Sequence, residues 1–196
     1  MRKLAYYVAV TLDGRIAGPG GEYDFFPAGD EQQTAAYQSW TTSLYPETVP
    51  TAVRAAFGLA HAPNRRFDTV LMGLGSYRPA LDAGISSPYA HLRQYVVSSS
   101  LGPAVDPAVT VVPSDPLALV RALKREDSDL DIWLCGGGRL AGVLLPEIDE
   151  LLIKSYPVVA GAGIPLVDGA FDPTVFTVAE RTAFPNGVTL TRLIRR

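Results

Sequence analysis

Three consecutive glycines occupy a point of the chain where the backbone itself could bind a ligand. Gly136, Gly137 and Gly138 follow an apolar run that ends at Cys135, and Arg139 comes directly after them. Glycine loses more conformational entropy on ordering than any other residue, so a triplet indicates that something approaches the backbone closely. If the triplet joins a strand to a helix, its unpaired N–H groups and the positive end of the helix dipole favour a phosphate, and Arg139 adds positive charge. A tight strand-to-helix turn without a ligand explains the glycines equally well.

The triplet does not match either of the common phosphate-binding fingerprints. The dinucleotide fingerprint Gly-x-Gly-x-x-Gly would place its third glycine at Ala141 or Gly142, and it usually follows the first strand of a fold. The Gly-Lys-Ser/Thr of a phosphate-binding loop of the nucleotide hydrolases is absent. The glycines therefore need support from elsewhere in the chain.

Small and hydroxyl-bearing residues follow two other apolar runs in the same way. Gly73, Gly75 and Ser76 come after one run, and Ser98 and Ser99 come after the next. Serine after a strand is often only a cap, so each segment alone is weak evidence. Because ligands of parallel sheets bind beyond the carboxyl ends of the strands, the three segments together indicate a ligand stretched along one sheet edge.

The apolar pattern alternates between strand-like and helix-like segments. The 30–60 region is mostly helical and is broken at Pro46 and Pro50, and Asp115 with Pro116 predicts the start of a helix that ends near Lys124. Asn186 and Gly187 predict a hairpin turn near the C-terminus. The expected strands cover residues 4–10, 68–72, 94–97, 109–112, 132–135, 151–156, 176–183 and 188–194.

Strands separated by helices predict an α/β fold. We expect a mostly parallel central sheet with helices on both faces and an antiparallel C-terminal hairpin at one edge. The sequence shows no internal repeat and no interdomain linker, so residues 1–196 are expected to form a single domain. The Gly- and Pro-rich stretch 18–29 is typical of a loop over a site.

The composition excludes several classes of protein. Of the 196 residues, 47% are hydrophobic and 19% are charged, which is typical of a globular chain, and the net charge of −3 gives no reason to expect a nucleic-acid partner. No apolar segment reaches the roughly 18 residues that span a bilayer, so we expect no membrane partner. Cys135 is the sole cysteine, which excludes an internal disulfide and favours the cytoplasm, and His61 and His91 show no metal-ligand spacing, so no metal is expected.

The order of these motifs resembles that of a known family. The pieces are VAVTLDGRIAG (8–18), DTVLMGLGSY (68–77), YVVSSSL (95–101), CGGGRLAGVLL (135–145) and DELLIKSYPVVAGAGIPLV (149–167). They resemble the dihydrofolate reductase-like superfamily, especially the C-terminal reductase domain of the bifunctional riboflavin biosynthesis protein. The resemblance implies an eight-stranded, mostly parallel sheet, an NADPH-dependent reductase and a homodimer.

The resemblance also assigns residues to the cofactor. It implies that the backbone of Ala9 meets the nicotinamide carboxamide and that Ile16 contacts the nicotinamide-ribose end. The remaining cofactor contacts that it implies are Gly73, Gly75 and Ser76 under the pyrophosphate and adenosine ribose, Ser98 and Ser99 near the ribose phosphate, and Gly136, Gly137, Gly138 and Arg139 around the pyrophosphate.

Leu74 departs from the family pattern, which usually has arginine at this position near the 2′-phosphate of the cofactor. A lost arginine–phosphate contact is not easily replaced, although Arg78 or Arg93 could supply the charge. We therefore expect NADPH as the cofactor, with NADH as the alternative.

The expected reaction is hydride transfer to a C=N or C=O carbon of a small heterocyclic or ribosylaminopyrimidine-like substrate. Such a reaction needs a proton donor, and Asp24, Asp30 and Glu31 are the candidates, although each is also readily explained as a solvated surface carboxylate. Tyr23, Phe25 and Phe26 either stack on a flat substrate or pack onto the core. Two alternatives stay open: a dinucleotide-binding protein without turnover, and a homodimeric structural module that associates through residues 157–161 and the C-terminal strands.

Overall fold

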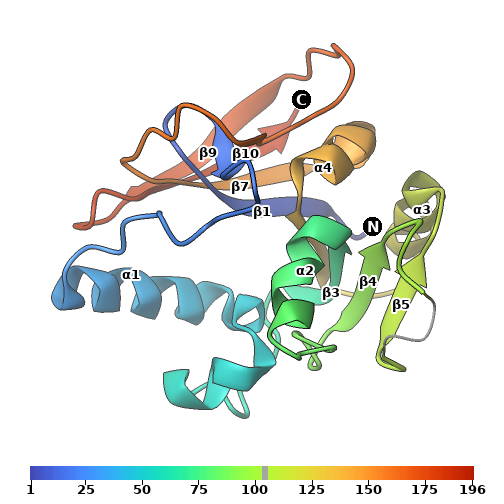
Figure 1. The fold of residues 1–196 in the computed structure, drawn as a ribbon, viewed down its shortest axis with the longest axis horizontal. Coiled ribbons are helices and arrows are strands. Elements are labelled where there is room, and N and C mark those ends of the chain that lie inside the picture. The colour runs from blue at the N-terminus through green and yellow to red at the C-terminus, as the bar shows by residue number, and fades with distance from the viewer. Residues whose placement is uncertain (103–105) are drawn as a thin grey trace.

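One eight-stranded sheet runs through the whole chain, as Figure 1 shows for a computed structural model that describes residues 1–102 and 106–196. The strands follow one another across the sheet in the order β5 (Val109–Val112), β4 (Arg93–Val97), β3 (Phe67–Gly73), β6 (Asp131–Gly136), β1 (Leu4–Val10), β7 (Glu150–Ser155), β10 (Thr189–Arg195) and β9 (Phe176–Ala183). The first six are parallel, whereas β10 is antiparallel to β7 and to β9. The predicted fold class is therefore confirmed.

The apolar runs form central strands because both faces of the sheet are covered. Along β1, Ala5 and Tyr7 belong to the core on one face, and Leu4 and Tyr6 belong to the core on the other. All four are nearly inaccessible to solvent. A parallel sheet that is buried on both faces requires such continuous apolar strands, which explains the absence of polar alternation in β1.

Two helices cover each face of the sheet. On the face of Ala5 and Tyr7 lie α1 (Glu31–Leu44) and α2 (Leu74–Asp82), which contribute Trp40 and the buried Tyr77. The opposite face carries α3 (Pro116–Lys124) and α4 (Gly138–Leu144), which contribute Leu123 and Leu144 among others. Short 3-10 helices lie at Pro46–Thr48, Thr51–Phe57 and Leu145–Glu147.

Two parts of the fold were not predicted. Helix α2 contains Gly75 near its start and Pro79 inside it, both of which disfavour a helix in isolation, and the burial of Tyr77 under it stabilises it instead. A small second sheet pairs β2 (Arg15–Ala17) with β8 (Ile164–Pro165), two segments too short to be recognised by periodicity.

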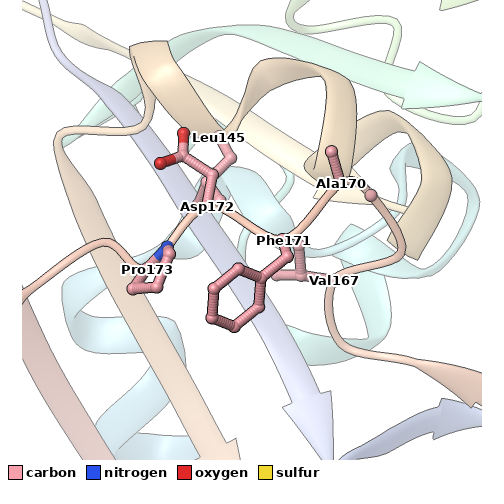
Figure 2. A pocket seen from close by; sticks show the side chains of 7 residues that line it. Leu145, Val167, Ala170, Phe171, Asp172 and Pro173 are labelled. Atoms are coloured by element: carbon pink, nitrogen blue, oxygen red, sulfur yellow. The ribbon is translucent and has the colours of Figure 1, made fainter.

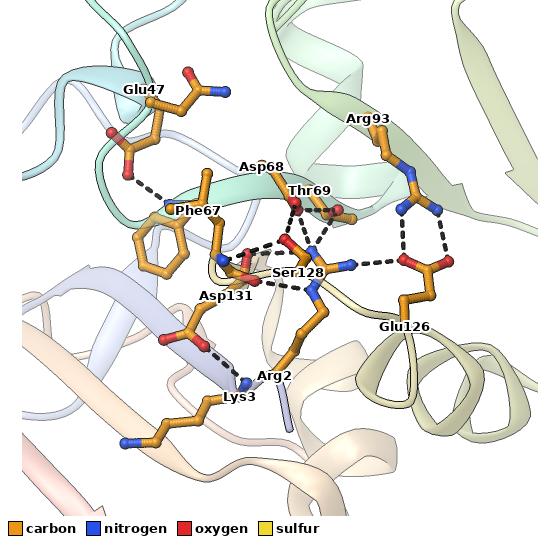
Figure 3. Close-up of polar contacts among 12 residues, drawn as sticks. Arg2, Lys3, Glu47, Phe67, Asp68, Thr69, Arg93, Glu126, Ser128 and Asp131 are labelled. Atoms are coloured by element: carbon orange, nitrogen blue, oxygen red, sulfur yellow. Dashed lines mark hydrogen bonds and ion pairs between the residues drawn. The ribbon is translucent and has the colours of Figure 1, made fainter.

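A buried arginine ties together the amino-terminal ends of the strands (Figure 3). The side chain of Arg2 is fully buried and forms ion pairs with Asp68 and, at 2.7 Å, with Glu126. It also donates hydrogen bonds to the carbonyl of Leu130 at 2.8 Å and to the hydroxyl of Thr69 at 2.9 Å. Asp68 and Thr69 lie at the start of β3, and Leu130 directly precedes β6. Arg2 therefore links the amino ends of these two neighbouring strands to the segment that precedes β1.

A buried carboxylate completes the polar layer at this edge of the sheet. Glu47 is inaccessible to solvent and accepts hydrogen bonds from the backbone N–H groups of Arg66, at 2.8 Å, and Phe67, at 2.7 Å. A buried backbone donor without an acceptor costs free energy, so Glu47 stabilises the start of β3. The polar groups of Arg2 and Glu47 at the amino edge are thus paired with other groups of the protein.

Replacing Arg2 with methionine should lower the free energy of unfolding by about 2–4 kcal/mol, because the carboxylates, the hydroxyl and the carbonyl that surround it lose their donor. Urea unfolding monitored by circular dichroism measures this change. The control is Arg121→Met, which breaks an ion pair with Glu147 in which the arginine side chain is 55% exposed. Exposed pairs contribute about 1 kcal/mol at most, so equal losses in the two variants would contradict the structural role of Arg2.

Candidate functional site

Two strand-to-helix turns touch each other at the carboxyl edge of the sheet. Strands β3 and β6 are neighbours, and they lead into α2 and α4 through Gly73 and Gly137, neither of which caps its helix with a side chain. A Cβ atom on Gly73 would lie 3.4 Å from the carbonyl oxygen of Gly136 and 3.4 Å from the nitrogen of Gly137. Two of the three segments singled out in the sequence therefore form one continuous backbone surface.

The three consecutive glycines differ in whether the fold requires a glycine at their position. Gly136 has a φ of +133°, a conformation that side chains rarely allow, and its peptide bond to Gly137 is cis. A Cβ on Gly138 would lie 2.2 Å from the carbonyl oxygen of Pro165, so this glycine is required by the packing of the β8 segment. Gly137 has a φ of −94° and would make only ordinary contacts. Gly137 is therefore the glycine that the fold alone does not explain.

Ser76 and Ile16 border the surface of Gly137. A Cβ on Gly137 would lie 3.7 Å from Ser76 Oγ and 3.8 Å from Ile16 Cδ1, and a Cβ on Gly136 would lie 3.2 Å from the same hydroxyl. Ser76 comes from α2 and Ile16 from β2. The structure thus brings together four of the residues that the resemblance assigned to the cofactor: Gly136, Gly137, Ser76 and Ile16. The apolar side chain of Ile16 and the hydroxyl of Ser76 both border Gly137.

Asp13 holds the turn that positions Ile16. Its carboxylate accepts hydrogen bonds from Thr11 Oγ1 at 2.6 Å and from the backbone N–H groups of Ala160 and Gly161 at 3.0 and 2.8 Å. The hydrogen bond from Thr11, with those from the two amides, lowers the pKa of this carboxyl to about 2. Asp13 is therefore a turn residue.

The two serines after β4 lie in different environments. Ser98 is buried, and its hydroxyl accepts hydrogen bonds from the N–H groups of Leu101 at 3.0 Å and Ser100 at 3.3 Å. Ser99 is exposed. A Cβ on Gly75 would also meet no atom within 4 Å, so Gly75 and Ser99 are both open to solvent.

The structure decides which arginine could replace the missing charge at Leu74. Arg93 begins β4 at the amino edge of the sheet and binds Glu126 through both guanidinium NH groups, so it cannot reach the carboxyl edge. Arg78 is exposed on α2, one turn beyond Leu74. Arg139 is 94% exposed and lies 3.6 Å from the carboxylate of Asp168. Arg78 and Arg139 thus remain as cations on the helices that follow the two turns.

The three candidate proton donors lie in an exposed segment before and at the start of α1. Asp30 caps α1: its carboxylate accepts from the N–H of Gln33 at 2.8 Å, and the side chain of Gln33 accepts from the N–H of Asp30. Asp24 and Glu31 are also exposed. Asp30, Glu31, Gln32 and Ala35 line a shallow hollow of about 470 Å³. Their role as proton donors stays a prediction.

Aromatic side chains fill the space between α1 and the carboxyl end of β7. The ring centroids of Phe25 and Phe26 are 4.6 Å apart, and that of Phe26 is 5.0 Å from the ring of Tyr156. Tyr156 donates a hydrogen bond to Tyr37 on α1 at 3.3 Å. Phe26 therefore packs onto the sheet, as one of the two interpretations expected.

Lys154 is a residue of this region that the sequence analysis missed. It lies on β7 directly opposite Ala9 of β1, and its ammonium nitrogen is 4.2 Å from the centre of the Tyr7 ring. Burial lowers the pKa of Lys154 to about 8, and burial raises the pKa of the neighbouring thiol of Cys135 to about 11. A lysine within the apolar strand LLIKSY, on the same face as Leu152 and Tyr156, was the available signal.

A second hollow lies elsewhere, over the 3-10 helix that follows α4 (Figure 2). It measures about 490 Å³ and includes Leu145, Val167 and Phe171, the last of which is 96% exposed. It does not include any of the glycine turns. Among the residues that the structure describes, no cluster of His, Cys, Asp and Glu side chains is arranged to hold a metal, and no helix has the length and apolarity to cross a membrane.

Comparisons with known proteins find similarity across nearly the whole chain. The model of the RibD C-terminal domain matches residues 2–190. The uncharacterised protein YwjB of Bacillus subtilis (strain 168) is 28% identical over 191 residues, which is 96% of each chain.

Solved structures share the fold at low sequence identity. A putative riboflavin biosynthesis protein from Shewanella sp. PV-4 superposes with a TM-score of 0.68 at 22% identity, covering 100% of this chain and 99% of that one. The deaminase and 5-amino-6-(5-phosphoribosylamino)uracil reductase of Thermotoga maritima gives 0.63 at 16% identity, and RibD of Acinetobacter baumannii gives 0.61 at 16%. This chain is covered completely in both, but it spans 57% and 58% of those two proteins.

Replacing Lys154 with methionine should raise the free energy of unfolding at pH 7 by about 1–3 kcal/mol, because the charge of a desolvated ammonium is removed while the aliphatic packing is kept. The pKa of about 8 lies below the ordinary value of 10.5, so the unfolded chain binds the proton more tightly. The free energy of unfolding of the native protein therefore rises as the pH increases from about 8 to 10.5. This gain is lost as the pH falls through 8.

Urea unfolding at pH 7 and at pH 10.5 measures the effect, and the difference between variant and native protein should shrink at the higher pH. The control is Lys3→Met, which removes an ion pair with Glu150 (2.8 Å) and should not stabilise the protein. A Lys154→Met variant that is less stable than the native protein at pH 7 would contradict the burial cost.

Proposed function

The chain belongs to the RibD C-terminal domain family, and on this premise we propose that it is a reductase that uses NADPH, with NADH as the alternative. We further propose that its substrate is a small heterocycle of the ribosylaminopyrimidine type that accepts a hydride at a C=N or C=O carbon. The observation that carries the proposal is the open backbone at Gly137, where two glycine turns meet and the fold alone gives no reason for a missing Cβ.

The residues present fit a dinucleotide at this edge. A Cβ on Gly75 would meet no atom within 4 Å, and one on Gly137 would meet only Ser76 Oγ at 3.7 Å and Ile16 Cδ1 at 3.8 Å. Backbone N–H groups of Gly137 and Gly75, with the Ser76 hydroxyl, would hold the diphosphate, since amides at strand-to-helix turns bind phosphate oxygens well. Ser99 would lie toward the adenosine ribose, and Ala9 and Ile16 toward the nicotinamide.

The bound cofactor would supply a hydride, and the chain would supply position, dryness and a proton. Ala9 is half-buried and small, so a flat ring can lie against the β1 backbone there. Phe26 and Tyr156 would exclude water from one side of that ring. Asp24, Asp30 and Glu31 stay proposed proton donors on the segment that precedes and begins α1.

A second candidate function is dinucleotide binding without turnover. Leu74 favours it, because this half-buried leucine begins α2 where a fixed positive charge would otherwise face the 2′-phosphate. A homodimer is compatible with both functions. The edge strand β9 exposes Val178 to 51%, and an exposed edge strand is a common surface for association.

Replacing Gly137 with valine should weaken NADPH binding more than tenfold, which corresponds to about 1.4 kcal/mol or more, because the side chain occupies the path of the diphosphate. Quenching of intrinsic tryptophan fluorescence during NADPH titration measures the affinity. The fold should be kept, since valine tolerates a φ of −94°. Ala122→Val, on the exposed face of α3, is the matched control, and unchanged affinity in Gly137→Val would refute the phosphate assignment.

Replacing Leu74 with arginine should favour NADPH over NADH by about 1–3 kcal/mol, the size of a charge-assisted hydrogen bond. The ratio of the two dissociation constants, measured for the native protein and the variant, gives this number directly. Leu74→Met is the uncharged control and should leave the ratio unchanged. If the arginine also leaves it unchanged, position 74 does not face the 2′-phosphate.

A further inference from the structure

Lys154 carries an ammonium group at the reacting end of the proposed site. We propose that Lys154 donates the proton that completes the reduction, an inference that rests on the proposed reductase function. The geometry behind it is the pairing of Lys154 with Ala9 on adjacent parallel strands and the position of its nitrogen over the Tyr7 ring.

Within the described part of the chain, no carboxylate forms an ion pair with the Lys154 ammonium. The titratable groups around the Tyr7 ring and the ammonium include Tyr7 on β1, Cys135 on β6, Tyr37 on α1, Tyr45 after α1 and Tyr156 directly after β7. Burial raises the pKa of each, so all are neutral at pH 7. Strand β10 contributes Leu190, which is paired with Lys154.

The charged groups further along this face bind one another. Glu150 and Arg192 form an ion pair at 3.0 Å, four residues toward the amino end of β7 from Lys154. Neither is free to neutralise the Lys154 ammonium.

The other two lysines of the chain are paired, which sets Lys154 apart. Lys3 lies 2.8 Å from Glu150 and Lys124 lies 2.8 Å from Asp149. Among the described residues, no carboxylate lies within 4.0 Å of the Lys154 nitrogen. An unpaired cation on a half-buried side chain reduces stability, and such costs are concentrated at functional sites.

The three loop carboxylates are less well placed for proton transfer. Asp30 already accepts the N–H of Gln33 as the helix cap. Tyr37, which reaches the end of β7, lies seven residues further along α1, or roughly 10 Å at the rise of an α-helix. Lys154 lies on the sheet itself, next to Ala9.

The proton transfer balances with a two-electron reduction. When the C=N or C=O carbon of the substrate receives the hydride, the π electron pair moves to the nitrogen or oxygen. One N–H bond of the Lys154 ammonium breaks, a new N–H or O–H bond forms on the substrate, and the lysine is left as a neutral amine. The half-buried side chain then regains a proton from water. An acid whose pKa lies near the working pH, here about 8, suits this step.

The first test is spectroscopic and needs no substrate. With three lysines in the chain, protein labelled with ¹³C at the lysine Cε gives few resonances, and the signal lost in Lys154→Met identifies Lys154. Its pKa is measured by NMR titration in complexes with NADPH and with NADP⁺. We expect a lower pKa with NADP⁺, because its nicotinamide ring is positively charged and like charges repel. Equal values in the two complexes would overturn the proposal.

The second test uses 5-amino-6-(5-phosphoribosylamino)uracil as the substrate. Lys154→Met should lower kcat by about 10²–10⁴-fold while NADPH affinity stays within twofold. Lys154→Arg keeps the charge but holds its protons too tightly to donate them, so kcat should stay low. In the native protein, kcat should fall as the pH rises above about 8, where the ammonium is lost.

The control is the combined variant Asp24→Asn, Asp30→Asn, Glu31→Gln. If this variant loses turnover and Lys154→Met retains it, the donor lies in the loop and the proposal is wrong. Absence of fluorescence quenching by NADPH in the native protein would overturn the reductase proposal and the lysine assignment with it. Quenching without any difference between the NADPH and NADP⁺ complexes would overturn the lysine assignment alone.

Discussion

The contact between the β3–α2 and β6–α4 turns is the constraint on which the site depends. Gly73 allows this contact, because its missing Cβ lets the Gly136 carbonyl and the Gly137 nitrogen come close. The pairing of β3 with β6 in a parallel sheet fixes both turns at the same edge. At the opposite edge, Arg2 and Glu47 are hydrogen-bonded to their partners within the protein. Sheet topology, more than any single side chain, thus decides where the two glycine turns meet.

Much of the fold was predictable because its central strands are continuous apolar runs. The strand 4–10 was predicted with the bounds of β1, and the hairpin strand 176–183 with those of β9. Helix α2 was missed because Gly75 and Pro79 oppose it locally, whereas the burial of Tyr77 that stabilises it is a long-range effect. Sequence reasoning sees propensity and periodicity, but it does not see which face another segment will cover.

The sequence indicated the glycine turns of the candidate site but not the lysine beside it. The three glycines in sequence predicted the sheet edge at Gly136 to Gly138. Only the structure shows that Gly138 differs from Gly137, because the Pro165 carbonyl leaves no space for a side chain at Gly138. Lys154 escaped notice because one charge in an apolar strand usually reaches the surface. Whether it does depends on the neighbouring strand β1 and its Tyr7, which lie more than a hundred residues away in sequence.

The packing of Gly138 against the β8 segment has a consequence for reading related sequences. Gly138 and Gly142 are both closed off by backbone, at Pro165 and Asp168, so any descendant that keeps this architecture must keep both, whatever its chemistry. Gly137 is under no such steric obligation. Under the proposed assignment, a homologue with a large residue at this position and intact glycines beside it would keep the fold without the proposed phosphate site. The residue at this one position would then distinguish relatives that bind the proposed ligand from relatives that keep only the fold.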